Sequence, residues 1–281
     1  QVVLVVGLFL LMVFYLARGF PHVKPEKFVP FAPNGLRGTF ATVGLVFISY
    51  GGLLQIASVS EEVREPGRVI PLGMVLSLII VTIFYTLMVF VTSGVLEASA
   101  LHESQTPITD GARAFMGASG AIVISVAAML AFVSTANAGI MAASRYLLAL
   151  SRDRLMPEPF SRVSSRFGSP HVAVLMTGAF AAVALFLPLE TLVKAASTVL
   201  ILSCILANVS VLVLRESGVQ NYRPIFKAPL YPWNQILGTV ALAFVVFEMG
   251  EQAYVIALAL LVFAFGVYWF YGRKRSAQES G

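Results

Sequence analysis

Apolar runs long enough to cross a membrane recur along this chain and set its fold class. The stretch 70–96, for instance, contains no charged residue. A helix needs roughly 20 such residues to cross the hydrocarbon core of a bilayer. Backbone N–H and C=O groups must find partners inside the hydrocarbon, and the runs lack strand-like alternation, so we expect the spans to be helices. The sequence therefore predicts an all-α, polytopic membrane helix bundle.

Composition and charge exclude a soluble domain. Of the 281 residues, 58% are hydrophobic and only 12% are charged, which is about half the charged share of a soluble protein. The excess of 19 Lys and Arg over 14 Asp and Glu falls mostly in loops. The preference of cytoplasmic loops for positive charge explains this excess, so we expect no nucleic-acid partner. The single cysteine, Cys204, lies in an apolar run and is expected to be a small core residue.

We predict eight spans with short connections. Their ranges are 2–17, 39–63, 70–96, 121–150, 171–187, 189–214, 233–249 and 252–271. The loop 20–38 is rich in proline and is predicted to be non-helical. Pro71 suits the first turn of the third span, and Pro188 suits a tight hairpin. The polar stretch 98–120 is expected to hold a short helix, 107–116, lying across a membrane face.

The basic residues also predict an orientation. With the tail at 272–281 in the cytoplasm, thirteen Lys and Arg lie inside and six lie outside, which accounts for all 19. Both chain ends are then cytoplasmic, and the membrane is expected to be the cell membrane. The chain starts at Gln1 and is apolar from Val2 onward, without the pattern of a signal peptide, so we expect further chain to precede it.

The second span is interrupted by two adjacent glycines. Ser49, Tyr50, Gly51 and Gly52 stand in the middle of its apolar run. A helix break at that depth is tolerated only where it is buried or lines a wet cavity, and its half-helix ends then attract charged groups. The alternative is that both glycines only permit close helix packing, as small residues do in membranes. Composition alone favours neither reading.

Three ordered motifs give the chain a resemblance to a known family. They are FISYGG at 47–52 with EEVREPGRVIP at 61–71, NAG at 137–139 with 144–157 and RFGSP at 166–170, and the proline-rich loop 214–232. Together they resemble the sixth helix, the eighth helix and the loop after the tenth helix of amino acid, polyamine and organocation permeases. The resemblance aligns this chain with the fifth to twelfth helices of a twelve-helix permease.

The resemblance implies a leucine-transporter-type inverted-repeat fold that lacks the first four helices. Residues 1–19 would be the last helix of the first repeat, and 20–38 an external loop. The second five-helix repeat would be 39–214, with its broken helix at 49–52. A cytoplasmic loop at 215–232, two C-terminal helices at 233–271 and a cytoplasmic tail at 272–281 would follow.

The resemblance also implies one wall of a substrate site. Carbonyls near Ile48, Tyr50 and Gly51 would take the substrate's amino group, and the Tyr50 ring would act as a gate. The substrate-binding set is expected to be Phe47, Ile48, Ser49, Tyr50, Gly51, Gly52 and Leu54. Leu54 stands where relatives for charged substrates carry an acid, so a neutral or apolar amino acid is favoured.

Two further sets are candidates for coupling and gating. Ser134 and Thr135 could give hydroxyl oxygens to a cation, whereas the alternative is that they bond to carbonyls one turn back. Glu61 and Glu62 end a helix where negative charge opposes the dipole, so one of them is expected to pair with Arg68 or Arg145 as a cytoplasmic gate. The alternative there is a solvated cluster at the headgroups.

These observations predict a secondary active amino acid permease that works by alternating access. The expected partners are the amino acid, a coupling H⁺ or Na⁺ ion and membrane lipid, with no cofactor and no bound metal. The spans contain none of the HExxH, GxSxG or paired-acid patterns of an enzyme. The alternative function is a non-transporting membrane subunit, or a remnant, that needs a partner for the missing repeat.

Overall fold

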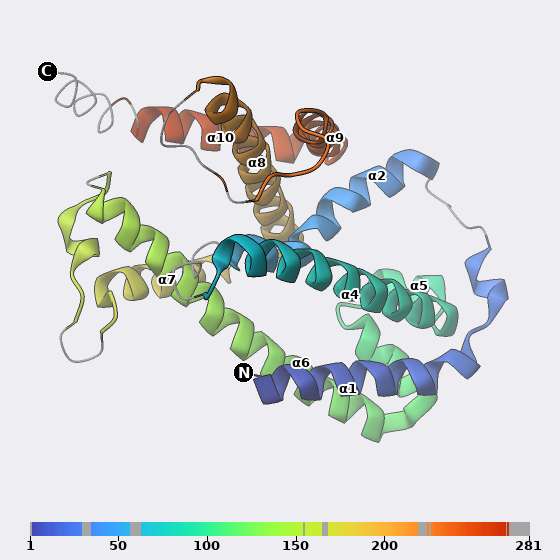
Figure 1. Cartoon of the computed structure of the whole chain (residues 1–281). Coiled ribbons are helices and arrows are strands. Elements are labelled where there is room, and N and C mark those ends of the chain that lie inside the picture. Colours follow the sequence, from blue (N-terminus) through green and yellow to red (C-terminus); the bar gives the residue numbers. More distant parts are fainter. Residues whose placement is uncertain are drawn as a thin grey trace, which may run out of the picture. The chain divides into compact units, whose positions relative to one another are not determined.

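A computed structural model describes residues 2–29, 35–56, 63–153, 155–164, 168–218, 224, 226–267 and 269. Every regular element among them is a helix (Figure 1). The chain forms two compact units, the first from residues 1–33 and 73–141 and the second from 34–72 and 142–281. The prediction of an all-α polytopic bundle is confirmed.

The first unit has a small core around a buried tyrosine. Its elements are α1 (Val2–Gly19), η1 (Phe20–His22), η2 (Pro25–Phe28), most of α4 (Pro66–Val95), α5 (Ala98–Glu103) and most of α6 (Pro107–Arg152). Tyr15 is fully buried and packs with Met88, Val91 and Ala112. The Thr92 hydroxyl donates to the Met88 carbonyl at 2.7 Å, so its oxygen accepts the Tyr15 O–H at 2.8 Å. The polar atoms of this apolar core are thereby satisfied.

The loop after α1 is partly helical, so the prediction of a non-helical loop at 20–38 was wrong. The two 3₁₀ helices η1 and η2 each carry a proline in the first turn, where a missing N–H costs no helical bond. The Lys24 N–H donates to the Gly94 carbonyl at 2.9 Å. The Lys27 ammonium pairs with the Glu97 carboxylate. These contacts hold η2 at the end of α4.

Two helix starts differ in how well the sequence predicted them. α6 begins at Pro107 as expected, and Gly117 then interrupts it with φ 69° and ψ −162°. The short helix predicted at 107–116 is therefore found. α4 begins at Pro66, so Pro71 lies inside it and the prediction of Pro71 in the first turn was wrong. The reason is that the Glu65 carbonyl accepts from the N–H groups of Arg68 and Val69, which starts the helix earlier.

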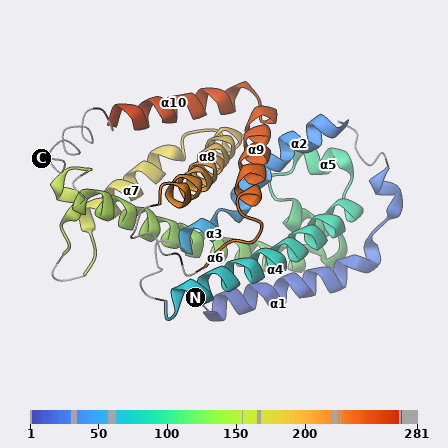
Figure 2. The same ribbon diagram turned by 45° about the horizontal axis from the view of Figure 1, so that its top comes forward.

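The second unit is built around α8. Its elements are α2 (Gly35–Val46), η3 (Phe47–Tyr50), α3 (Gly52–Gln55), the start of α4, the end of α6, η5 (Glu158–Ser161), α7 (His171–Ala184), α8 (Leu189–Glu216), α9 (Trp233–Glu248) and α10 (Glu251–Val267). Ile201 of α8 is fully buried against Val246, Met249 and Ala253. At the other end of the α8–α9 pair, the Arg215 guanidinium lies over the Tyr231 ring at 4.4 Å. Figure 2 shows α9 and α10 beside α8.

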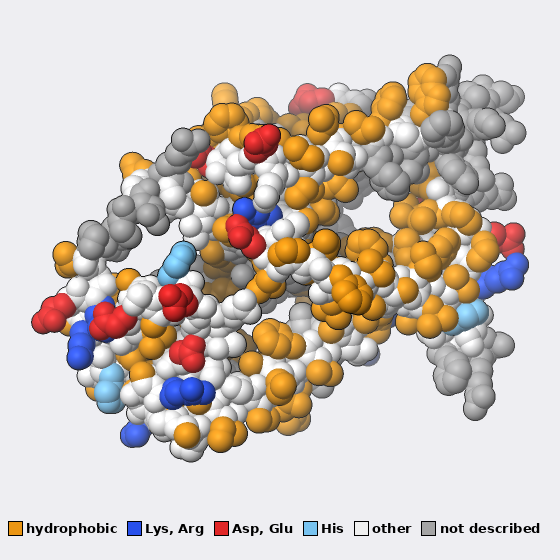
Figure 3. Space-filling model, turned by 180° about the vertical axis from the view of Figure 1, so that it is seen from behind, with side chains coloured by type: hydrophobic (Ala, Val, Ile, Leu, Met, Phe, Trp, Pro, Cys, Tyr) orange, Lys and Arg blue, Asp and Glu red, His pale blue; other side chains and the backbone are white. Residues whose placement is uncertain are grey.

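The helices have the length and surface of membrane spans. Among the described residues, four helical segments, 3–22, 66–95, 107–152 and 189–216, are long and apolar enough to cross a membrane, and four shorter apolar helices accompany them. Leu72, Val75, Leu76, Ile79 and Ile83 form an exposed apolar stripe along α4. Figure 3 shows hydrophobic side chains spread over the visible face. Such a surface suits lipid and not water.

The interruption of α6 generates a stability prediction. Gly117 has backbone angles that residues with a side chain rarely adopt. We therefore expect Gly117→Ala to lower the free energy of unfolding by roughly 1–3 kcal/mol. Gly139→Ala on the same helix is the control, because a methyl group there meets nothing within 4 Å. Thermal unfolding in detergent measures both variants. Equal midpoints for the two variants would contradict the strain at Gly117.

The Lys27–Glu97 pair predicts a pH dependence. The hydrogen bond and charge of Lys27 lower the pKa of the Glu97 carboxyl from its ordinary 4.5. The pair therefore stabilises η2 fully above that ordinary pKa, and its contribution falls as pH drops from there through the lowered value. The protection of the Lys27 and Phe28 amides against hydrogen exchange, measured relative to the exchange rate of an unstructured peptide at the same pH, should fall on acidification. Glu97→Gln should show the low protection at every pH, whereas Glu103→Gln should leave the pH dependence intact.

Candidate functional site

The predicted break in the second span is a change of helix type. α2 ends at Val46, the chain turns as 3₁₀ helix over Phe47–Tyr50, and α3 starts at Gly52. Gly51 keeps right-handed angles, with φ −60° and ψ −24°, and its N–H donates to the Ile48 carbonyl at 2.9 Å. The backbone therefore tightens here instead of unwinding into an extended strand.

The change of helix type alters which carbonyls have backbone partners. An α-helix bonds N–H to the carbonyl four residues back and a 3₁₀ helix to the one three residues back, so a carbonyl is skipped at the junction. At the end of α2 the Ser197 hydroxyl of α8 donates to the Leu45 carbonyl, with 3.4 Å between the oxygens. Ser197 is fully buried. A side chain from α8 thus supplies a donor beside the break.

The two glycines of the break have different surroundings. A methyl group on Gly51 would lie 2.7 Å from Leu200 Cδ1 and 3.0 Å from the Ile48 carbonyl oxygen. Gly51 thus lets the 3₁₀ segment approach α8 closely, which is the packing role that the sequence left as an alternative. A methyl group on Gly52 would meet none of the described residues within 4 Å. Packing therefore does not explain Gly52.

The remaining substrate-site candidates divide between core and surface. Phe47 packs against the buried cluster that holds Ile201. Ile48 and Tyr50 are half-buried, whereas Ser49 is exposed on the outer side of η3. Leu54 lies in α3, and its side chain is outside the described residues. The structure therefore brings 47–52 together as one short segment of the second unit.

The cation and gate candidates are only partly described. Ser134 and Thr135 lie in the middle of α6, in the first unit. Neither hydroxyl bonds to a carbonyl one turn back among the described residues, whereas the hydroxyls of Thr177, Thr198 and Ser203 do so at 2.8 Å.

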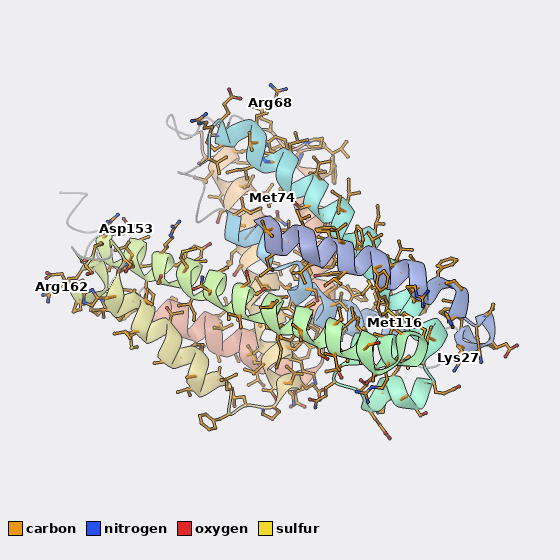
Figure 4. The ribbon with its side chains drawn as sticks, turned by 90° about the horizontal axis from the view of Figure 1, so that it is seen from below. Lys27, Arg68, Met74, Met116, Asp153 and Arg162 are labelled. Atoms are coloured by element: carbon orange, nitrogen blue, oxygen red, sulfur yellow. The ribbon has the colours of Figure 1, made fainter. Side chains whose placement is uncertain are left out.

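The four gate candidates were Glu61, Glu62, Arg68 and Arg145. Glu61 and Glu62 lie outside the described residues. Arg68 is exposed in the first turn of α4, as Figure 4 shows, and Arg145 is half-buried near the end of α6. No metal-binding cluster of His, Cys, Asp or Glu occurs in the described part of the chain.

Sequence reasoning missed the part that α8 plays at this site. Ser197 and Ile201 are four residues apart and share one face of α8, where both are fully buried. The available signal was the adjacent pair of hydroxyl residues, Ser197 and Thr198, inside the predicted span 189–214. A polar pair at that depth indicates interhelical hydrogen bonding.

The unlike surroundings of the two glycines generate a prediction. Gly51→Ala should lower the free energy of unfolding by roughly 1–3 kcal/mol, because the methyl group overpacks against a backbone oxygen and α8. Gly52→Ala is the matched control, and it should be neutral or stabilise α3 by up to about 1 kcal/mol. Thermal unfolding of both variants in detergent tests this. Equal destabilisation would contradict the assignment of separate roles.

Comparison with known proteins identifies the family. The family model described as amino acid permease matches residues 1–280. A Bacillus subtilis branched-chain amino acid permease, BcaP, is 27% identical over 98% of this chain and 59% of its own length. A methylthioribose transporter of the same organism is 26% identical over 95% of this chain and 58% of its own length. The Arabidopsis thaliana vacuolar cationic amino acid transporter 2 is 31% identical over 70% of this chain and 31% of its own length.

The chain thus spans a little over half the length of the two Bacillus relatives. The match extends along nearly the whole chain and agrees with the three ordered motifs, so the resemblance seen in the sequence is confirmed. This chain belongs to the amino acid permease family.

Proposed function

We propose that the protein containing this chain transports amino acids across a membrane by alternating access. The observation that carries the proposal is the change of helix type at 47–50, inside an apolar helix, in a member of the amino acid permease family. Irregular backbone at membrane depth is tolerated where it lines a cavity, and transporters place substrate at such points. No covalent chemistry is involved.

In this proposal the carbonyl end of α2 receives the substrate's amino group. α2 is a 12-residue helix, and its C-terminal end at Val46 carries the negative end of the helix dipole. The Ile48 carbonyl already accepts from Gly51, but a carbonyl oxygen has a second lone pair. Gly52, with open space at its Cα, lets a ligand approach the backbone. Tyr50 serves as the gate beside it.

The proposed substrate is a neutral or apolar amino acid. Leu54 carries no charge, and the apolar spans contain no Asp or Glu in their middle thirds. A cationic side chain would need a buried carboxylate as its partner. The name of the branched-chain relative agrees with this choice, whereas the Arabidopsis relative is named for cationic substrates.

Coupling to H⁺ or Na⁺ completes the proposed cycle. The Ser134 and Thr135 hydroxyls make no bond one turn back within the described part of the chain, and they are oxygen ligands of the kind that Na⁺ takes. Glu61 or Glu62 would pair with Arg68 or Arg145 to close the cytoplasmic side. In the proposed organisation, residues 39–214 form the second inverted repeat, and both chain ends lie in the cytoplasm of a cell whose plasma membrane holds the protein.

Uptake by the full-length protein tests this proposal. In reconstituted vesicles, labelled leucine should accumulate at least tenfold faster than labelled arginine, because arginine would place an unpaired cation at depth. Comparing uptake under an imposed Na⁺ gradient and an imposed pH gradient identifies the coupling ion. Ser134→Ala should reduce uptake driven by a Na⁺ gradient and leave uptake driven by a pH gradient unchanged. Equal uptake of both amino acids would contradict the substrate class. A folded protein that moves neither amino acid would contradict transport.

A further inference from the structure

A groove in the first unit lies between α1 and α6 and has two chemically different ends. Its volume is about 330 Å³. The lining residues are Leu11, Phe14 and Arg18 on α1, and Met116, Ser119, Gly120, Val123 and Ile124 on α6. The α1 residues are spaced three and four apart, so they form one stripe along that helix. In α6, Ser119, Gly120, Val123 and Ile124 share one face after the interruption at Gly117, and Met116 lies just before it.

The polar groups gather at one end of the groove. Arg18 is at the C-terminal end of α1 and Ser119 is at the start of the second part of α6, so the two helices run antiparallel along the groove. The other end is lined by Leu11, Val123 and Ile124. Arg18 follows Leu11 by seven positions, which is about 10 Å along a helix. The groove is thus amphipathic along its length.

The polar end coincides with the expected edge of the membrane. The span in α1 is predicted to end at Ala17 and the one in α6 to begin at Ala121, so Arg18 and Ser119 lie just outside both. Figure 4 shows Met116, which also lines this end, in the same part of the first unit as Lys27 of the polar loop. Headgroups occupy this level of a bilayer.

Arg18 has no acidic partner among the described residues. Its guanidinium is exposed, whereas Lys27 and Lys194 both pair with carboxylates. A guanidinium is well matched to phosphate because it donates two parallel hydrogen bonds. The apolar end offers exposed faces of Phe14 and Val123, which are 52% and 49% exposed. A free anion would leave those faces uncovered.

We propose that this groove binds an anionic phospholipid, with the phosphate on Arg18 and Ser119 and an acyl chain along Leu11, Phe14, Val123 and Ile124. Charge complementarity selects the headgroup, and the length of the apolar stripes selects an amphiphile over a soluble phosphate. The site belongs to the first unit and is separate from the helix break at 47–50. It requires nothing of the proposed transport cycle.

Native mass spectrometry of the full-length protein tests the site. After incubation with phosphatidylglycerol or phosphatidylethanolamine, the wild type should retain the first lipid in preference. Arg18→Gln should lower that retention by about fivefold, because the variant loses the attraction that one basic residue exerts on an anionic lipid. Arg18→Lys should keep most of it. Val123→Trp, which fills the apolar end without changing charge, should abolish it.

Two controls separate this site from general attraction. Arg113→Gln removes an exposed positive charge from the same unit outside the groove, and it should leave retention unchanged. Excess inorganic phosphate should not displace the lipid. The proposal is overturned if the wild type retains both lipids equally or neither, if Arg113→Gln and Arg18→Gln act alike, or if phosphate alone competes.

Discussion

Satisfying backbone hydrogen bonds inside hydrocarbon is the constraint on which this structure depends. An unpaired N–H or C=O costs several kcal/mol where no water can reach it. The chain meets the constraint with long uninterrupted helices such as α4 and α8. Where a helix is interrupted near Phe47, the backbone tightens into a 3₁₀ turn, which keeps the Gly51 N–H bonded to the Ile48 carbonyl and skips one carbonyl at the junction. The Ser197 hydroxyl of α8 donates a hydrogen bond to the Leu45 carbonyl at the end of α2. The interruption therefore remains compatible with membrane depth.

Close approach of helices is the second condition, since lipid tails give no hydrophobic drive for helices to associate. The side chain of Met249 lies against Gly44 and that of Leu200 against Gly51, so α2 and η3 contribute no side chain of their own at these points. Ile201, Val246 and Ala253 fill the adjoining core. Dispersion contacts at short range then hold the interrupted helix to α8 and α9. The substrate-site candidates consequently sit on a supported segment.

The sequence predicted the helices well because apolar length and proline position are local signals. The starts at Pro107, Leu189 and Trp233 follow from such signals and agree with the structure. The start of α4 was missed because it depends on the carbonyl of Glu65, a residue at φ 50°. The 3₁₀ turns after α1 were missed because they are held by contacts to α4, which are distant in sequence. Packing partners such as Leu200 are likewise not encoded in any local pattern.

The candidate site illustrates the same division between local and distant signals. Two adjacent glycines read alike in a sequence, yet a methyl group would collide at Gly51 and stand in open space at Gly52. The packing explanation therefore applies to the first glycine, whereas no described residue packs against the position of a second-glycine side chain. A residue that costs helix stability without serving packing needs another explanation. Ligand access to the backbone provides one, so Gly52 carries more of the functional argument than Gly51.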